Sequence, residues 1–196
     1  MDKKRIYEYV KRALDVFFSV ILLALLSIPM LIIAMLVTIT SDGSVIFKQE
    51  RVGADGRIFV CYKFRTMYKD TPADRPTNEF FDAESYITSI GRFLRKTSLD
   101  ELPQLYNVLL GDMSLVGPRP LIPCETKAHE LRKRCGVYRV RPGITGLAQI
   151  RGRDLLGTVD KVRYDVRYVS RLSFKEDIRI IGSTALQVAK RKDVTY

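Results

Sequence analysis

A long apolar run near the N-terminus constrains the fold of this chain more than any other feature. Between Val16 and Ile39 the only polar side chains are those of Ser19, Ser27 and Thr38. A helix rises about 1.5 Å per residue, so a helix of this length crosses a hydrocarbon core of roughly 30 Å. The run therefore predicts a membrane helix, and a soluble domain has to be built from the residues that follow it.

A proline interrupts this run. Pro29 cannot donate a backbone N–H, and its ring clashes with the carbonyl four residues earlier, so a helix kinks there unless another group satisfies the freed backbone. Ser27 supplies a nearby hydroxyl. Two topologies remain open, namely a kinked helix that spans the membrane once and a re-entrant helix hairpin that returns to its side of origin.

Basic residues on both sides of the run favour the hairpin. Positive charge beside a membrane segment tends to stay in the cytoplasm, so a spanning helix would have to export one of two basic clusters. A re-entrant hairpin, with its break at Ser27 and Pro29, exports neither. No clear small-residue cleavage site follows the run, which argues against a signal peptide. The flanking cations are Lys3, Lys4, Arg5, Lys11 and Arg12 before the run and Lys48, Arg51, Arg57, Lys63 and Arg65 after it.

The rest of the chain has the length of one modest domain. The whole chain of 196 residues carries a formal net charge of +11, which implies an anionic neighbour such as nucleic acid, anionic lipid or a phosphorylated substrate. The apolar run favours the last two. Cys61, Cys124 and Cys135 show no metal-ligand or redox spacing, so a domain without disulfides that faces the cytosol is expected. We predict a membrane-associated part over residues 1–41 and a cytosolic domain over residues 42–196.

Residue patterns beyond the run predict an α+β domain that is mostly helical. The segments "VIFKQERV" and "RIFVCYKF", joined by "GADG", predict a β-hairpin over residues 45–64, with positive φ at the turn glycines. The polar stretch from Thr66 to about Phe80 predicts a mobile loop that could close over a ligand. The segment "RVRPGITGLAQIRGRD" predicts an irregular loop. Helices are predicted at residues 83–96, 101–110, 123–135, 158–171 and 174–191.

The last predicted helix is amphipathic. Ile178, Ile181, Ala185 and Val188 fall along one stripe, and basic residues end the helix. Such a helix could lie on a membrane surface as an interfacial helix, or it could pack its stripe on the core of the domain. The pattern leaves both possibilities open.

Several kinds of catalytic chemistry are poorly supported by the sequence. His129 is the single histidine and lies in a charged helical stretch, which predicts a solvated side chain rather than a base or a ligand. No Gly-x-x-x-x-Gly-Lys loop is present, so a P-loop is excluded. Arginines and a few carboxylates remain, above all Asp100 and Glu101 in "RKTSLDELPQLYNVLLGDMSLVGPRP".

Two interpretations of this acidic pair remain open. Ser98-x-x-Glu101 matches a capping box, although Pro103 would then destabilise the helix unless the cap moves to Asp100. Alternatively, carboxylates among cations stay ionised, bind a hard cation such as Mg²⁺ and can attack an electropositive phosphorus. That combination is needed for phosphoryl transfer, and the two roles are compatible.

Nearby cations provide candidate phosphate ligands. Arg119 in "GPRP" lies between two prolines, which reduces the entropy lost when its planar fork engages a phosphate. Lys63 and Arg65 in "YKFRTM", at the end of the second strand, are further candidates.

The motifs together resemble a known family. The segments "KRALDVFFSV", "YKFRTM", "TSLDELPQLYNVLLGDMSLVGPRP" and "VRPGITGLAQIRGR" resemble the bacterial sugar transferases, the monotopic phosphoglycosyl transferases, from about Lys11 to Lys190. The resemblance implies transfer of a sugar 1-phosphate from a UDP-sugar to polyprenol (undecaprenyl) phosphate with release of UMP, initiating surface glycan biosynthesis. It implies contact with bacterial inner-membrane lipid, a catalytic domain facing the cytoplasm and no nucleic-acid partner. Larger relatives carry further N-terminal segments, so a minimal catalytic form is expected.

The resemblance also implies roles for individual residues. Asp100 would be the nucleophile that forms a covalent aspartyl-phosphosugar intermediate, and Glu101 would assist with Mg²⁺ and positioning. In the family that this chain resembles, the re-entrant helix breaks at a Ser-Pro pair. The corresponding residues here are Ser27-Ile28-Pro29, so one residue separates the serine from the proline. The implied substrate-site residues are Lys63, Arg95, Arg119, Pro120, Arg141, Gln149 and Arg153.

Two other classes of function compete with this enzyme. A membrane-tethered binding module would use its basic loops for anionic lipid or nucleic acid, with strong salt dependence and without turnover. A structural partner protein would need an exposed apolar patch. No residue pattern identifies which sugar an enzyme of this kind would use.

Overall fold

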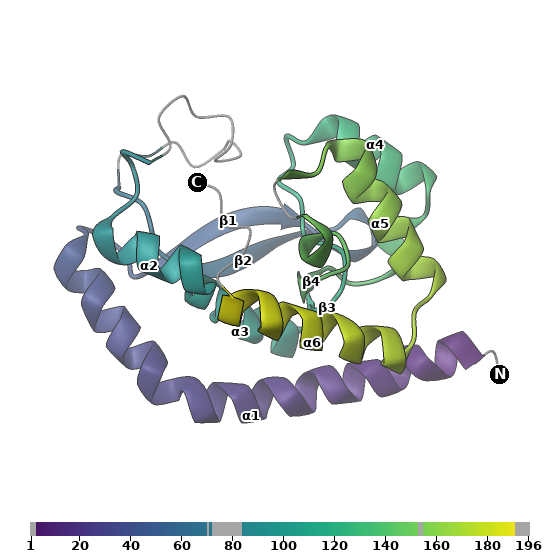
Figure 1. The fold of residues 1–196 in the computed structure, drawn as a ribbon, viewed down its shortest axis with the longest axis horizontal. Helices are drawn as coiled ribbons and strands as arrows, with labels where there is room; N and C mark the ends of the chain where they lie inside the picture. The colour runs from purple at the N-terminus through teal and green to yellow at the C-terminus, as the bar shows by residue number, and fades with distance from the viewer. Residues whose placement is uncertain (1–2, 70, 72–83, 153–154, 191–196) are drawn as a thin grey trace.

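The computed structural model describes residues 3–69, 71, 84–152 and 155–190, where helices and two small sheets form the α+β fold predicted above. One long helix, α1 (Lys3–Thr40), runs along one side of the molecule, and the remaining elements fold against it (Figure 1). The other α-helices are α2 (Ser89–Thr97), α3 (Gln104–Leu110), α4 (Thr126–Arg134), α5 (Thr158–Ser170) and α6 (Phe174–Lys190). The strands are β1 (Ile46–Val52), β2 (Ile58–Phe64), β3 (Ser114–Val116) and β4 (Gly143–Thr145).

The predicted β-hairpin is confirmed, with β1 antiparallel to β2. Its turn differs from the prediction in one detail. Gly56 takes a positive φ of 75°, but the second such residue is Asp55, with φ of 55°, whereas Gly53 has φ of −100°. Aspartate is one of the few residues with a side chain that tolerates this conformation, so only one of the two glycines is needed for it.

A second sheet forms where the sequence predicted an irregular loop. β4 pairs in parallel with β3, Ser114 lying opposite Gly143. A three-residue strand is too short to show an apolar alternation, so the prediction was wrong here. The two backbones approach so closely that a Cβ on Gly143 would lie 2.0 Å from the amide nitrogen of Gly117. This close approach joins the "GPRP" loop to the "RPGITG" segment.

The start of α2 lies later than predicted. Ile87 pairs with Met67 in an isolated β-bridge, so the chain is still extended there and the helix begins at Ser89. Thr88 then caps the helix, because its hydroxyl accepts a hydrogen bond of 2.9 Å from the amide of Gly91.

Other sequence predictions agree with the structure more closely. α4, α5 and α6 lie within the predicted ranges 123–135, 158–171 and 174–191, although residue 191 itself is outside the described residues. Most of the predicted loop from Thr66 to Phe80 is also outside them. The three cysteines are free, as the absence of a redox spacing predicted.

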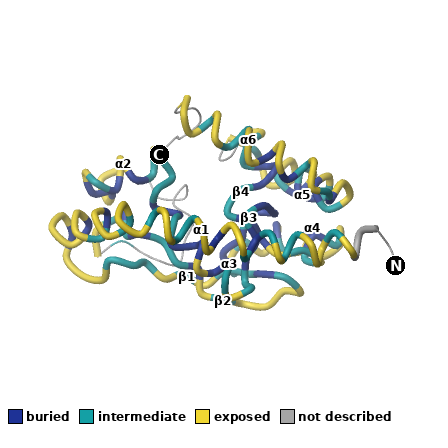
Figure 2. Tube along the Cα trace, turned by 90° about the horizontal axis from the view of Figure 1, so that it is seen from below, coloured by how far each residue is buried: buried dark blue, intermediate teal, exposed yellow. Residues whose placement is uncertain are grey.

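Apolar contacts join the C-terminal part of α1 to the hairpin and α2. Ile33 and Val37 are buried in a cluster with Phe64 and Leu94. Most of the helix between its two ends is exposed, which is visible as yellow along α1 in Figure 2. The segment Ile6–Thr40 is long and apolar enough to cross a membrane.

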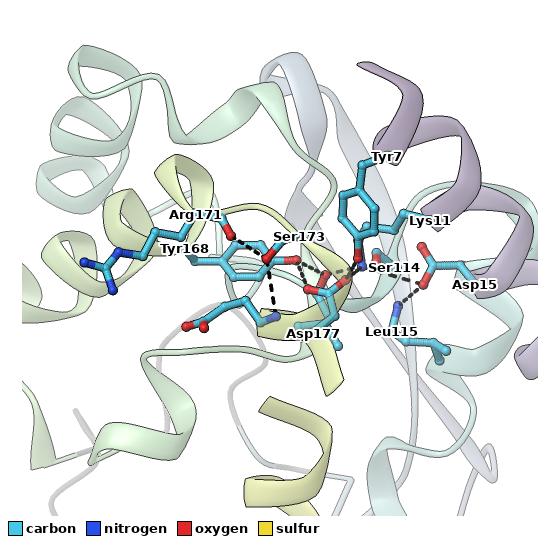
Figure 3. Close-up of polar contacts among 11 residues, drawn as sticks. Tyr7, Lys11, Asp15, Ser114, Leu115, Tyr168, Arg171, Ser173 and Asp177 are labelled. Atoms are coloured by element: carbon cyan, nitrogen blue, oxygen red, sulfur yellow. Dashed lines mark hydrogen bonds and ion pairs between the residues drawn. The ribbon is translucent and has the colours of Figure 1, made fainter. Parts of the chain in front are cut away.

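A polar cluster joins the N-terminal part of α1 to α5 and α6. Three groups converge on the carboxylate of Asp177: the hydroxyl of Tyr7 at 2.7 Å, Nζ of Lys11 at 2.6 Å and the hydroxyl of Tyr168 at 2.8 Å (Figure 3). Both ends of α1 are therefore fixed to the same domain.

Pro29 lies inside α1, which is one continuous helix that bends along its length (Figure 1). The structure thus has a single bent helix in place of two separate ones. The hydroxyl of Ser27 donates to the carbonyl oxygen of Ala24 at 2.8 Å. This bond satisfies a carbonyl in the turn before the proline. It does not satisfy the carbonyl of Leu25, which has no helical donor because Pro29 lacks a backbone N–H.

Candidate active site

Two neighbouring carboxylates lie between α2 and α3. Ser98 ends α2 in the left-handed conformation, with φ of 57°, and the short helix η3 (Leu99–Glu101) follows. Ser98 makes no capping bond through its side chain, and the N-cap of α3 is Pro103. Both capping interpretations of the acidic pair are therefore wrong. Asp100 and Glu101 are instead buried, at 8% and 7% exposure.

Glu101 lies between two cations from distant parts of the chain. Its Oε1 is 2.8 Å from Nζ of Lys63, at the end of β2, and 3.4 Å from Nη1 of Arg119, in the loop after β3. The side chain of Glu101 is 9% exposed, that of Lys63 is 18% exposed and that of Arg119 is 37% exposed. Screening by water is weaker in such a partly buried site than at the surface. The structure thus brings together Lys63, Glu101 and Arg119, as the sequence predicted.

The loop that carries Arg119 is held by side chains that sequence reasoning missed. Nη1 of Arg132 donates to the carbonyl of Arg119 at 2.7 Å, while its Nη2 pairs with Asp165 at 2.6 Å in a buried ion pair. Nη1 of Arg51 donates to the carbonyl of Pro120 at 3.0 Å. These bonds fix the backbone on which the Arg119 guanidinium is presented.

The local electrostatics favour a bound phosphate. Burial, together with the charge of Arg119, lowers the pKa of Arg51 to about 10, so the side chain remains cationic at neutral pH. Burial also raises the pKa of the Cys61 thiol, so this cysteine stays protonated and is a poor nucleophile. Positive charge is therefore concentrated beside two carboxylates, an arrangement that can bind a phosphate group.

Asn107 is a further residue that sequence reasoning missed. This buried side chain accepts from the amide of Tyr62 at 3.0 Å and donates to the carbonyl of Val60 at 2.7 Å. It fixes α3 to β2, and hence the chain next to Glu101 to the strand that carries Lys63. No sequence pattern distinguishes an asparagine in this position from an exposed one.

Two more predicted site residues lie near the carboxylates. Nε of Arg95 donates to the hydroxyl of Thr66 at 3.0 Å, just beyond the end of β2. Gln149, in the short helix η5 (Gln149–Arg151), lines a cavity together with Glu101, and its amide donates to the carbonyl of Ile144 at 2.9 Å.

Two other predicted residues, Arg65 and Arg141, are not brought to this cluster. Nη1 of Arg65 donates to the carbonyl of Asp42 at 2.6 Å, just after α1. Nε of Arg141 donates to the carbonyl of Gly111 at 2.8 Å, at the opposite end of α3 from Glu101. Arg153 is outside the described residues.

The prediction that His129 is a solvated side chain is wrong. The ring is half-buried, its Nε2 is 2.8 Å from the carbonyl oxygen of Ile122, and its Nδ1 contacts the hydroxyl of Tyr138. These contacts support α4 against the loop after β3. Both partners lie outside α4, Ile122 before the helix and Tyr138 after it, so the charged neighbours of His129 within the helix gave no sign of them.

Asp100 and Glu101 could hold a metal ion. Among the residues with described positions, no three His, Cys, Asp or Glu side chains gather into a closed metal cage. Mg²⁺ does not require one, because it is commonly bound by one or two carboxylates, water and the phosphate oxygens of a substrate. The donor set of this pair fits that mode of binding.

A family model matches almost the whole chain. The model described as bacterial sugar transferase matches residues 6–191. The chain belongs to the bacterial sugar transferase family.

Curated relatives of this bacterial sugar transferase include several with named activities. It is 38% identical to the undecaprenyl-phosphate galactose phosphotransferase of Salmonella typhimurium, over 98% of this chain and 43% of that protein. It is 39% identical to the UDP-glucose:undecaprenyl-phosphate glucose-1-phosphate transferase of Escherichia coli, over 90% and 39%. It is 36% identical to the exopolysaccharide production protein ExoY of Sinorhizobium fredii, over 89% and 83%. The chain thus spans less than half the length of the first two relatives.

Proposed function

We propose that this bacterial sugar transferase is a phosphoglycosyl transferase. It would move a sugar 1-phosphate from a UDP-sugar to polyprenol (undecaprenyl) phosphate, release UMP and so initiate surface glycan synthesis. The observation that carries this proposal is the buried pair Asp100 and Glu101 beside Lys63 and Arg119. The Escherichia relative is named for UDP-glucose and undecaprenyl phosphate, and the Salmonella relative is named for undecaprenyl phosphate and galactose.

The cations of the site would bind the diphosphate of the donor. The planar guanidinium of Arg119 can donate two parallel hydrogen bonds to phosphate oxygens, and Lys63 adds a compact positive charge. Because Arg132 and Arg51 hold the carbonyls of Arg119 and Pro120, the loop is positioned before substrate binds. This preorganisation supports a binding role for the loop.

The proposed chemistry uses Asp100 twice. Its carboxylate attacks the sugar-bearing phosphorus, and the bond from that phosphorus to the bridging oxygen breaks, so UMP leaves with the electron pair. A phosphate oxygen of polyprenol phosphate then attacks the same phosphorus, and the bond to Asp100 breaks and restores the carboxylate. A covalent intermediate splits one displacement into two, so a soluble and a lipid-embedded substrate need not react directly with each other.

Mg²⁺ is part of this proposal. Asp100 and Glu101 would hold it, and a bound divalent cation neutralises charge on phosphate oxygens. Lys63 and Arg119 both contact Oε1 of Glu101 and so orient that carboxylate.

We further propose that α1 enters and leaves the membrane on one side, with the domain on the cytoplasmic face of the inner membrane. Contacts at the two ends of the helix support this topology. Lys11 pairs with Asp177 of α6, while Val37 packs with Phe64 and Leu94. A helix that crossed the bilayer would separate these two sets of contacts, because one domain cannot lie on both sides.

The apolar stripe of α6 supports the same topology. Ile180 faces the core and is fully buried, but the residues of the predicted stripe are exposed. They are Ile178, Ile181, Ala185 and Val188. Of the two alternatives for this helix, the exposed stripe favours a position on the membrane surface.

The proposal is tested with purified protein, polyprenol phosphate and a panel of UDP-sugars. We expect repeated turnover that releases UMP from at least one UDP-sugar, with Asp100→Asn as the inactive control. Salt-sensitive binding to anionic vesicles without UMP from any UDP-sugar would instead support a membrane-tethered binding module.

A further inference from the structure

An apolar cavity of about 330 Å³ lies beside the candidate active site. One part of its wall is made by Leu22 and Leu26 of α1, and another by Ile181 and Val188 of α6. Glu101 reaches the same cavity. A single space therefore connects Glu101, the neighbour of Asp100, to the two elements that carry the exposed apolar surface.

Polar side chains also line the cavity. Besides Glu101 they are Lys96, Ser98, Thr145, Gln149, Thr184 and Gln187. Oε1 of Gln149 is buried and accepts no hydrogen bond from the residues that the structure describes. A buried acceptor without a donor is unfavourable, so the part of the cavity beside Gln149 suits a polar group.

The two helices that line the cavity, α1 and α6, also carry exposed apolar side chains. Leu25, next to Leu26 on α1, is 71% exposed. On α6, Ile178 is 51% exposed and Leu186 is 61% exposed. If these residues contact lipid, the cavity is continuous with the hydrocarbon of the membrane, and its ligand is an amphiphile.

We propose that this cavity binds the first isoprene units of the polyprenol phosphate acceptor. The acceptor phosphate lies toward Asp100 and Glu101, and the rest of the chain passes between α1 and α6 into the bilayer. A volume near 330 Å³ is at the small end of ligand sites, so only the start of a long prenyl chain is held. The inference rests on the proposed function for the identity of the acceptor.

The chemical character of the lining supports this occupant over others. A sugar nucleotide would place charged and hydroxylated groups against leucine and isoleucine, which is unfavourable without hydrogen bonds. A prenyl chain buries apolar surface against these residues, and the ammonium of Lys96 in the lining complements a phosphate. The donor would then bind on the side of Lys63 and Arg119, and the acceptor on the side of α1 and α6.

The test fills the cavity with a larger side chain. We expect Ile181→Trp and Leu26→Trp to raise the KM for polyprenol phosphate at least tenfold, while UMP release from UDP-sugar alone changes less than twofold. The matched controls are Ile178→Trp and Leu25→Trp, which place the same side chain on the same helices outside the cavity, and their acceptor KM should stay within twofold of wild type. An unchanged acceptor KM in both cavity variants would overturn the inference.

A second measurement does not depend on turnover. Wild-type protein is irradiated with a prenyl phosphate that carries a diazirine on its first isoprene unit, and the labelled peptides are identified by mass spectrometry. We expect labelling within residues 22–26 and 181–188 that polyprenol phosphate suppresses. Labelling confined to other segments, or suppressed equally well by a phospholipid, would contradict the inference. If UMP is never released but this labelling occurs, the proposed reaction fails and the prenyl phosphate site stands.

Discussion

Lys63 and Arg119 meet the same carboxylate oxygen of Glu101, but their side chains bind phosphate differently. An ammonium is a compact charge, whereas a guanidinium presents a rigid fork of donors. The difference matters only if Arg119 contacts the substrate, so a substitution that keeps the charge can test its role.

We expect Arg119→Lys to slow UMP release about tenfold or more, because one charge-assisted hydrogen bond to phosphate contributes about 1.5–3 kcal/mol. Initial rates at saturating Mg²⁺ measure this effect. The control is Arg163→Lys, since Arg163 lies on α5 with a side chain that is 75% exposed. Equal rates in the two variants would argue against a substrate contact by Arg119.

The ion pair between Arg132 and Asp165 is buried, with side chains 4% and 1% exposed. Burial raises the pKa of Asp165, and the charge of Arg132 opposes that rise. We expect Arg132→Met to lower the free energy of unfolding by about 3–5 kcal/mol, because it leaves a carboxylate buried without its partner. Urea unfolding in detergent micelles measures the change.

The matched control is Arg163→Met. The pair of Arg163 with Asp160 is solvated, with side chains 75% and 51% exposed, so we expect a change below about 1 kcal/mol. Similar values for Arg132→Met and Arg163→Met would show that the buried pair does not stabilise the loop of Arg119.

Charged residues that belong to a short sequence motif could be predicted as candidate site residues. Lys63, Glu101 and Arg119 belong to this set, and they come together in the structure. Arg51 and Arg132 could not be found in this way, because their roles depend on packing between segments far apart in the chain. A buried arginine has no local signature that separates it from a solvated one.

At the scale of elements, predictions from local sequence patterns were wrong where tertiary contacts determine the conformation. The capping box at Ser98 matched a sequence rule, but Ser98 takes the left-handed conformation and ends α2. Strand β4 was missed because its pairing with β3 depends on a close approach of two glycine-containing segments. The hairpin and the longer helices were predicted well, since their periodicity extends over more residues.

The topology of α1 gives a prediction for this element. In a background with the exposed Cys124 and Cys135 replaced by serine, we expect single cysteines at Lys3 and Gly43 to be labelled only from the cytoplasmic side. Impermeant maleimide on intact cells, compared with permeabilised cells, measures this accessibility. Labelling of either position from outside would show that α1 crosses the membrane.

The variant Pro29→Leu extends this test. Leucine restores a backbone donor and removes the ring clash, so we expect a shift toward a helix that spans the bilayer. Ile28→Leu is the control, because it leaves the backbone hydrogen bonds intact. An unchanged labelling pattern in Pro29→Leu would show that the proline does not determine the topology.

At the scale of the whole molecule, Glu101 contacts both a cationic loop and an apolar cavity. The sequence predicted both a membrane helix and a charged site. It could not predict that both ends of α1 contact the same domain, because those contacts involve Asp177 at one end and Leu94 at the other.

The dependence of UMP release on Mg²⁺ is a property of the whole reaction. We expect EDTA to abolish UMP release and excess Mg²⁺ to restore it, because the carboxylate pair supplies oxygen ligands to a cation that neutralises the diphosphate. A coupled UMP assay at fixed ionic strength measures this. Full activity in the chelator would remove the metal from the proposed mechanism.

The covalent role of Asp100 is the central claim, and a single incubation tests it most directly. The enzyme is mixed with its UDP-sugar in the absence of polyprenol phosphate, and UMP and intact protein mass are measured together. We predict UMP in a one-to-one ratio with enzyme and a mass increase equal to one sugar phosphate, both absent in Asp100→Asn, because an amide is a poor nucleophile. An adduct in Asp100→Asn, or UMP that forms only after polyprenol phosphate is added, would contradict the assignment of Asp100 as the nucleophile.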